Sequence, residues 1–268
     1  MSVRKRVRSV AARLLTEPPP TRFTGDYASW EEARAASGGY DEQAILEKVT
    51  QAALKVKNGE AVFERDSVLF DSIQYSWPVL AGLLWVASRS GNSLNVLDFG
   101  GSLATAYNQN RRFLQHLGTL RWNVIEQEPF VRTGRELFET EQVRFYESIG
   151  ACTADTDPNV ALVSASLAYV PQPYVVLEEI RSQSFAYLIF DRNFFSPDRD
   201  RLTVQTVPPW IYDASYPAWF LDEQRFLAVV EAEYERVAEF EGLERSVALT
   251  DGTGRSKGFI FERRSDAP

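Results

Sequence analysis

The sequence contains one cysteine and one histidine among its 268 residues. A lone cysteine, Cys152, excludes a disulfide within the chain and a zinc site built from several cysteines, which suits a reducing compartment. No Ser, His and Asp triad can be assembled without His116, and the surrounding RRFLQHL pattern predicts that this histidine lies to the side of a helix. These absences argue against a disulfide scaffold, a cysteine-rich metal site and a serine hydrolase.

Long apolar runs and an excess of basic residues are absent too. The sequence contains no run of about 18 apolar residues, so no membrane-spanning helix is predicted. The start also lacks the apolar core of a secretion signal. The formal net charge of -8 argues against nucleic acid as a partner, because phosphate binding needs clustered Lys and Arg. With 44% hydrophobic and 13% aromatic residues, the chain can bury the core of one cytoplasmic domain with extensions.

The first fifteen residues are basic and contain no acid. Apolar residues repeat among them at helical spacing, which predicts a short amphipathic helix that ends before Pro18. The plainer interpretation is a solvated or docked leader, and the alternative is weak contact with the anionic inner face of a membrane. We divide the chain into this leader with a Pro-rich linker (1–29), a helical cap (30–90) and a larger domain (91–268) that contains a loop over 191–220.

A glycine turn in the segment NVLDFGGSLATAY (95–107) is the strongest local signal. A buried strand that ends in an acidic residue and a glycine turn is typical of a cofactor seat in parallel α/β proteins. The dinucleotide pattern G-x-G-x-x-G would require glycines where the chain has Ser102 and Thr105. The pattern acid-x-Gly-x-small-x-small fits Asp98, Gly100, Ser102 and Ala104, although a turn that binds nothing remains the alternative.

Glu126 follows the next predicted strand, 28 residues after Asp98 (126 − 98), an interval that suits one strand, one helix and the next strand. A carboxylate at this place can accept hydrogen bonds from both ribose hydroxyls of an adenosine. A solvated charge at a strand end is the alternative.

Alternating apolar segments predict a mainly parallel sheet with helices between its strands. Strands are expected over 122–125, 143–146, 160–164 and 186–190, and helices over 44–56, 78–87, 111–117 and 173–182. The segments 235–240 and 258–263 are expected to form a C-terminal hairpin, with a turn-rich connection over 250–258.

The chain resembles a family of S-adenosylmethionine-dependent methyltransferases found among bacterial surface-polysaccharide genes. The matching segments are SGGYD (37–41), ERDS (64–67), YSW (75–77), LDFGGSL (97–103), IEQ (125–127), Asp191 with Arg192, and VQTVPPWIYDASYPAW (204–219). The resemblance implies a Rossmann-like class I methyltransferase fold: a seven-stranded, mainly parallel sheet with an antiparallel C-terminal hairpin and an N-terminal helical extension. Ala104 stands where the family has glycine, at no cost in a helical backbone but at about 1 to 2 kcal/mol in a left-handed one.

Site residues follow from this resemblance and from position along the chain. Asp191 is the expected catalytic base with Arg192 beside it, although a structural ion pair is an equal alternative. The cofactor S-adenosylmethionine is expected at Asp98, Gly100, Gly101, Ser102, Glu126, Gln127, Ser148, Ile149 and Ser164. The acceptor is expected at Tyr40, Arg65, Tyr75, Tyr169, Trp210, Tyr212 and Tyr216. We expect no metal, because Arg199 and Arg201 alternate with the acids Asp198 and Asp200.

Three functions stay open at this stage. The leading hypothesis is a methyltransferase that O-methylates a sugar or glycan intermediate of cell-surface polysaccharide biosynthesis. The alternatives are a nicotinamide-dependent oxidoreductase on a Rossmann-like fold and a noncatalytic cofactor-binding module.

Overall fold

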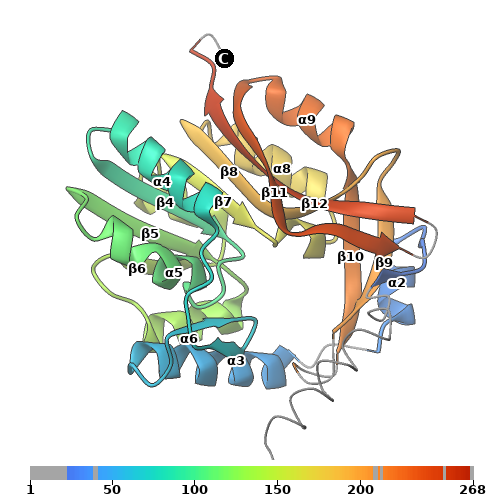
Figure 1. The fold of residues 1–268 in the computed structure, drawn as a ribbon, viewed down its shortest axis with the longest axis horizontal. Helices are drawn as coiled ribbons and strands as arrows, with labels where there is room; N and C mark the ends of the chain where they lie inside the picture. Colours follow the sequence, from blue (N-terminus) through green and yellow to red (C-terminus); the bar gives the residue numbers. More distant parts are fainter. Residues whose placement is uncertain (1–22, 39–41, 208–210, 212–213, 250–251, 266–268) are drawn as a thin grey trace, which may run out of the picture.

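The computed structural model in Figure 1 describes residues 23–38, 42–207, 211, 214–249 and 252–265. The predictions for residues 1–15 and for Tyr40, Trp210 and Tyr212 lie outside these residues. The helices are α2 (Trp30–Ala36), α3 (Glu42–Lys57), α4 (Trp77–Arg89), α5 (Thr105–Leu114), α6 (Glu128–Leu137), α7 (Ile149–Asp155), η1 (Leu167–Tyr169), α8 (Pro173–Ser182) and α9 (Glu223–Glu231). The strands are β1 (Phe23–Thr24), β2 (Phe63–Arg65), β3 (Val68–Phe70), β4 (Ser93–Phe99), β5 (Thr119–Ile125), β6 (Val143–Tyr146), β7 (Val160–Ser164), β8 (Tyr187–Ser196), β9 (Arg201–Thr206), β10 (Ser215–Asp222), β11 (Tyr234–Leu249) and β12 (Gly252–Arg263).

The central strands stand in the order β6-β5-β4-β7-β8-β12-β11. The first five are parallel, whereas β12 runs antiparallel to both β8 and β11. Because β12 lies between β8 and β11, the last two strands of the chain occupy the sheet in reversed order. This is the Rossmann-like arrangement of class I methyltransferases, and it confirms the predicted fold class.

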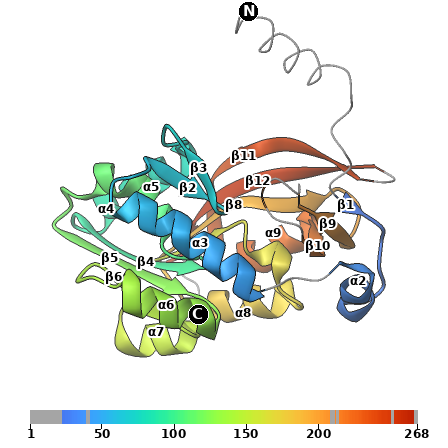
Figure 2. The same cartoon turned by 90° about the horizontal axis from the view of Figure 1, so that it is seen from below.

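Helices cover both faces of this sheet, since neighbouring strand residues point to opposite sides. On one face Val96 packs in a core with residues of α3, α4, α5 and α6, whereas Leu97 packs on the other face with residues of α7, α8 and α9. Helix α3 also lies against α6 and the β2–β3 hairpin (Figure 2). Helix α4 therefore packs directly on the central sheet. The domain boundary expected at residue 90 would separate this helix from the sheet that it covers.

The segment expected as a loop over 191–220 is mostly strand. Strand β8 continues to Ser196, and β9 and β10 form an antiparallel pair that β1 extends, so the sheet has ten strands instead of seven (Figure 1). The aromatic and proline content suggested a rigid loop, but β10 pairs with β8 only through Leu221 and Asp222. At Pro217 the strand thus has one paired neighbour, where a missing N–H is tolerated.

Three other boundaries differ from the sequence prediction. The hairpin β2–β3 interrupts the expected helical cap, and α5 begins and ends earlier than 111–117. The connection expected over 250–258 is mainly strand β12, whose small residues Gly254 and Gly258 face the rings of Phe220 and Phe240. The glycines here make room for aromatic side chains of other strands. The sequence alone does not distinguish such glycines from those of a turn.

Candidate functional site

The turn after β4 has a backbone that approaches its neighbours too closely for side chains. A Cβ atom added at Gly100 would collide with the side chain of Ser166, and one added at Gly101 would collide with the Asp98 carboxyl group. The Ser166 hydroxyl also donates to the Phe99 carbonyl (2.6 Å). Gly100 has a φ of 71°, in the region that favours glycine. Both glycines of the motif are therefore required by space, and the first also by conformation.

Two further residues of the turn have left-handed backbone conformations. Ser102 has a φ of 55°, and Ala104 has φ 67° and ψ 37° at the position that precedes α5. Alanine in place of glycine is thus strained at this point, by about 1 to 2 kcal/mol.

Asp98 lies beneath the turn and is 1% exposed. The indole N–H of Trp122 donates to its Oδ2 (2.8 Å). Burial raises the pKa of Asp98 from 3.8 to about 7, against the opposing effect of this hydrogen bond. Asp98 is consequently a structural support under the turn, directed at β5.

Glu126 connects the end of β5 to the turn. Its Oε1 accepts from the Ser102 N–H (3.1 Å) and its Oε2 from the Gln127 N–H (3.0 Å). Burial raises the pKa of Glu126, and the two backbone hydrogen bonds oppose that rise. Each oxygen keeps a further acceptor direction, because a carboxylate offers about four lone-pair sites.

The remaining residues expected at the cofactor take different positions. Gln127 is exposed at the start of α6. The Ser148 hydroxyl accepts from the Ala151 N–H (3.1 Å) and so caps α7. Ile149, the first residue of α7, is 2% exposed and packs in the core.

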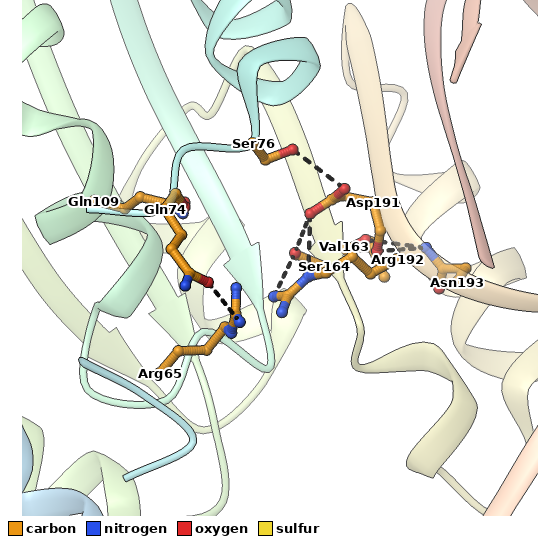
Figure 3. Close-up of polar contacts among 9 residues, drawn as sticks. All are labelled: Arg65, Gln74, Ser76, Gln109, Val163, Ser164, Asp191, Arg192 and Asn193. Atoms are coloured by element: carbon orange, nitrogen blue, oxygen red, sulfur yellow. Dashed lines mark hydrogen bonds and ion pairs between the residues drawn. The ribbon is translucent and has the colours of Figure 1, made fainter. Parts of the chain in front are cut away.

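A second polar group lies where β7 and β8 cease to pair (Figure 3). Asp191, 3% exposed, accepts at Oδ2 from the Ser164 hydroxyl (2.9 Å) and from Arg192 Nε (3.3 Å). Its Oδ1 lies 3.4 Å from the donating hydroxyl of Ser76, just before α4. Asp191 was expected at the end of its strand, but β8 continues beyond it.

A β-bulge explains why the side chains of Asp191 and Arg192, consecutive residues of β8, point to the same side of the sheet. The pairing of β8 with β12 shifts register between Lys257 and Phe259, and Arg192 has a φ of 53°. The Asn193 amide holds the irregular backbone by donating to the carbonyls of Val163 (3.2 Å) and Asp191 (3.1 Å). Bulges of this kind redirect a side chain next to many active sites.

The N-terminal hairpin approaches the same edge. Glu64 on β2, 4% exposed, accepts at Oε1 from the Thr105 hydroxyl at the first residue of α5. Burial raises the pKa of Glu64, and the hydrogen bond from Thr105 opposes that rise. Arg65 Nη2 donates to Gln74 Oε1 (3.0 Å), and the Gln109 amide donates to the Gln74 carbonyl.

The described aromatic candidates form two separate groups. Tyr169 and Tyr216 lie together, with ring centroids 5.5 Å apart, and the Tyr169 hydroxyl donates to Gln205 Oε1 (2.8 Å). Tyr75 instead packs against Trp77 (4.8 Å) and Phe113 on the outer side of α4 and α5.

Sequence reasoning missed several site residues. They are Glu64, Gln74, Ser76, Gln109, Trp122 and Ser166. Glu64 and Ser76 lie within the ERDS and YSW segments, which offered a signal for them. The other four gave none, because their contacts join distant parts of the chain.

No family model matches the sequence, and no curated protein matches it. In the described part of the chain, no helix is long and apolar enough to cross a membrane. Among the same residues, no three His, Cys, Asp or Glu side chains gather in a way that could hold a metal ion.

Solved structures of several methyltransferases resemble the fold. The N-terminal domain of EvdMO1, crystallised in the presence of SAH and D-fucose, has a TM-score of 0.49 and 13% identity over 84% of this chain and 98% of that one. A 1,6-didemethyltoxoflavin-N1-methyltransferase from Burkholderia thailandensis has a TM-score of 0.40 and 16% identity, over 85% of this chain and 92% of that one. Magnesium protoporphyrin IX methyltransferase from Synechocystis PCC 6803 has a TM-score of 0.42 and 12% identity, over 85% of this chain and 99% of that one. Similarity at these levels transfers neither a cofactor nor a substrate to this chain.

The raised pKa of Asp98 makes stability depend on pH. Asp98→Asn removes the titrating group and keeps an oxygen for Trp122. Because the folded state retains a proton that the unfolded chain loses, the contribution of Asp98 to stability falls as pH rises from 3.8 to about 7. Between about pH 5.5 and about pH 8.5, urea unfolding should show wild type losing about 1 to 2 kcal/mol relative to D98N. A difference between the two proteins that is the same at both pH values would contradict this assignment.

Proposed function

We propose that the protein is an S-adenosylmethionine-dependent methyltransferase that O-methylates a sugar or glycan intermediate of cell-surface polysaccharide biosynthesis. One observation carries the proposal: the bare turn at Gly100 and Gly101 follows the central strand β4, and the Glu126 carboxylate bonds to the Ser102 amide of the same turn. In open α/β sheets, ligands bind outside the carboxyl ends of the strands, where the strand order reverses. Strand β4 lies at that point, between β5 and β7.

The residues present fit the adenosyl donor. Gly100 and Gly101 expose backbone to its methionine part, and the free acceptor directions of Glu126 suit two ribose hydroxyls. Gln127 would also meet the ribose, Ser148 and the backbone of Ile149 would stand beside the adenine, and Ser164 beside the methionine part. Asp98 would act from beneath, by holding the turn.

The N-terminus of α5 argues against a nicotinamide dinucleotide. Such cofactors place a pyrophosphate at this helix end, where backbone N–H groups attract anions. Here the buried carboxyl group of Glu64 already bonds to Thr105, at the first residue of the helix. A second anionic group at this position would meet like charge and occupied space.

Asp191 is the residue that we assign as general base. When bound, S-adenosylmethionine supplies a methyl group already activated by its sulfonium, so the protein has to orient the acceptor and exclude water. Oδ2 of Asp191 is held by Ser164 and Arg192, whereas Oδ1 has only the 3.4 Å contact from Ser76. Oδ1 can therefore take the proton of an acceptor hydroxyl, and Arg192 stabilises the carboxylate.

The acceptor is assigned to the side of the β9–β10 extension. Tyr169 and Tyr216 meet there, next to Gln205, and tyrosine rings combine an apolar face with a polar group. Such a pair suits the CH faces and hydroxyls of a sugar. Tyr40, Trp210 and Tyr212 are also proposed to contact the acceptor, although they lie outside the described residues. We propose that the reaction takes place in the cytoplasm.

Calorimetric titration with S-adenosylhomocysteine and NAD tests the cofactor assignment. We expect wild type to bind S-adenosylhomocysteine and not NAD. Glu126→Gln should weaken that binding about tenfold or more, because an amide replaces one acceptor oxygen in a charge-assisted hydrogen bond. The matched control is E128Q, which alters an exposed acid two residues away on α6. Binding of NAD alone would refute the methyltransferase assignment.

Asp191→Asn tests the base. Transfer of labelled methyl from S-adenosylmethionine into polysaccharide intermediates should fall about 10²- to 10⁴-fold, the usual range for a lost general base. Affinity for S-adenosylhomocysteine should stay unchanged, and D198N, at an exposed acid before β9, should transfer as wild type does. Full activity of D191N would exclude Asp191 as the base.

A further inference from the structure

Two arginines from distant parts of the chain point toward one another at the edge of the sheet (Figure 3). Arg65 comes from β2, and Arg192 comes from the bulge of β8. Guanidinium groups keep their positive charge at every pH at which proteins fold. Two of them directed into one space repel each other unless an anion lies between them.

Both arginine heads are held in orientation by neighbouring groups. Arg192 donates through Nε to Asp191 (3.3 Å) and through Nη2 to Ser164 (3.1 Å). Arg65 donates through Nη2 to Gln74 and has its guanidinium carbon 5.4 Å from the centre of the Phe70 ring. Nη1 of Arg192 makes no hydrogen bond to any residue that the structure describes, so two of its N–H groups can bind a ligand.

The backbone at Arg192 is strained in order to place this side chain. A φ of 53° is unfavourable for a bulky residue, and such outliers cluster at functional sites. In a regular strand Arg192 would point to the face opposite Asp191, whereas the bulge brings both side chains to Ser164.

Asp191 balances the positive charge of Arg192 only in part. Asp191 contacts Arg192 through one hydrogen bond only, without the two-bond geometry that a guanidinium can form with a carboxylate.

We propose that Arg65 and Arg192 together bind the anionic group of a ligand, a carboxylate or a phosphate, at the carboxyl end of β7 and beside the bulge of β8. The planar donors of two guanidinium groups match the oxygens of either anion. Resting on the proposed function, two sources can supply it: the amino-acid carboxylate of the methyl donor, or an acidic group on the acceptor. The site thus gives this enzyme a preference for a charged ligand.

The test compares wild type with R65Q, R192Q and the control R89Q in the full chain. Arg89 lies at the far end of α4 with its side chain 56% exposed, so its loss leaves the site untouched. Calorimetry measures binding of S-adenosylhomocysteine and of 5′-deoxy-5′-methylthioadenosine, a related thioether nucleoside without the amino-acid part. Thermal unfolding in inorganic phosphate, against chloride at equal ionic strength, measures anion binding independently of any nucleoside.

Each outcome decides the proposal. If R65Q and R192Q weaken S-adenosylhomocysteine about tenfold or more and leave the methylthio nucleoside unchanged, the anion is the donor's carboxylate. If only stabilisation by phosphate is lost, the anion belongs to the acceptor. If neither variant changes either quantity relative to R89Q, the proposal is wrong. Failure of the proposed function shows separately, as absent nucleoside binding in wild type, and the phosphate measurement then still decides the arginine site.

Discussion

The close packing of the turn after β4 is the constraint on which the rest of the site depends. Gly100 and Gly101 fit only because they lack side chains, since a Cβ would collide with Ser166 at the first and with the Asp98 carboxyl group at the second. The hydrogen bond from Trp122 fixes that carboxyl group, and Glu126 fixes the far side of the turn through the Ser102 amide. A bare stretch of backbone is thereby held at the edge of a rigid sheet, where a ligand can approach it.

Charge is divided across this edge. On the side of α5 and β5, three acids each bond to a protein donor: Asp98 and Glu64, which are buried, and Glu126, which is half-buried. Desolvation raises the pKa of each. On the side of β7 and β8, the positively charged Arg192 donates to Asp191. This division suits a donor with hydroxyl groups on one side and an anionic ligand group with a nearby base on the other.

The sequence predicts the central architecture well because apolar segments report burial directly. The bounds of β6, β7 and α8 agree with expectation. Strand β10 was missed because a proline such as Pro217 indicates a loop unless an edge position tolerates it. Strand β9 contains neither proline nor an aromatic residue, and its short alternation of Leu202 and Val204 was not recognised. The contact of Glu64 with Thr105 could not be predicted because it joins residues 41 positions apart. The left-handed backbone at Arg192 could not be predicted either, because the usual sign of this conformation is a glycine.

The most direct test of this account is a crystal structure of the full chain grown with S-adenosylhomocysteine. We expect the nucleoside over residues 100–104, with both ribose hydroxyls within hydrogen-bonding distance of the Glu126 carboxylate. A nucleoside bound elsewhere, or a turn covered by the protein's own side chains, would contradict the account.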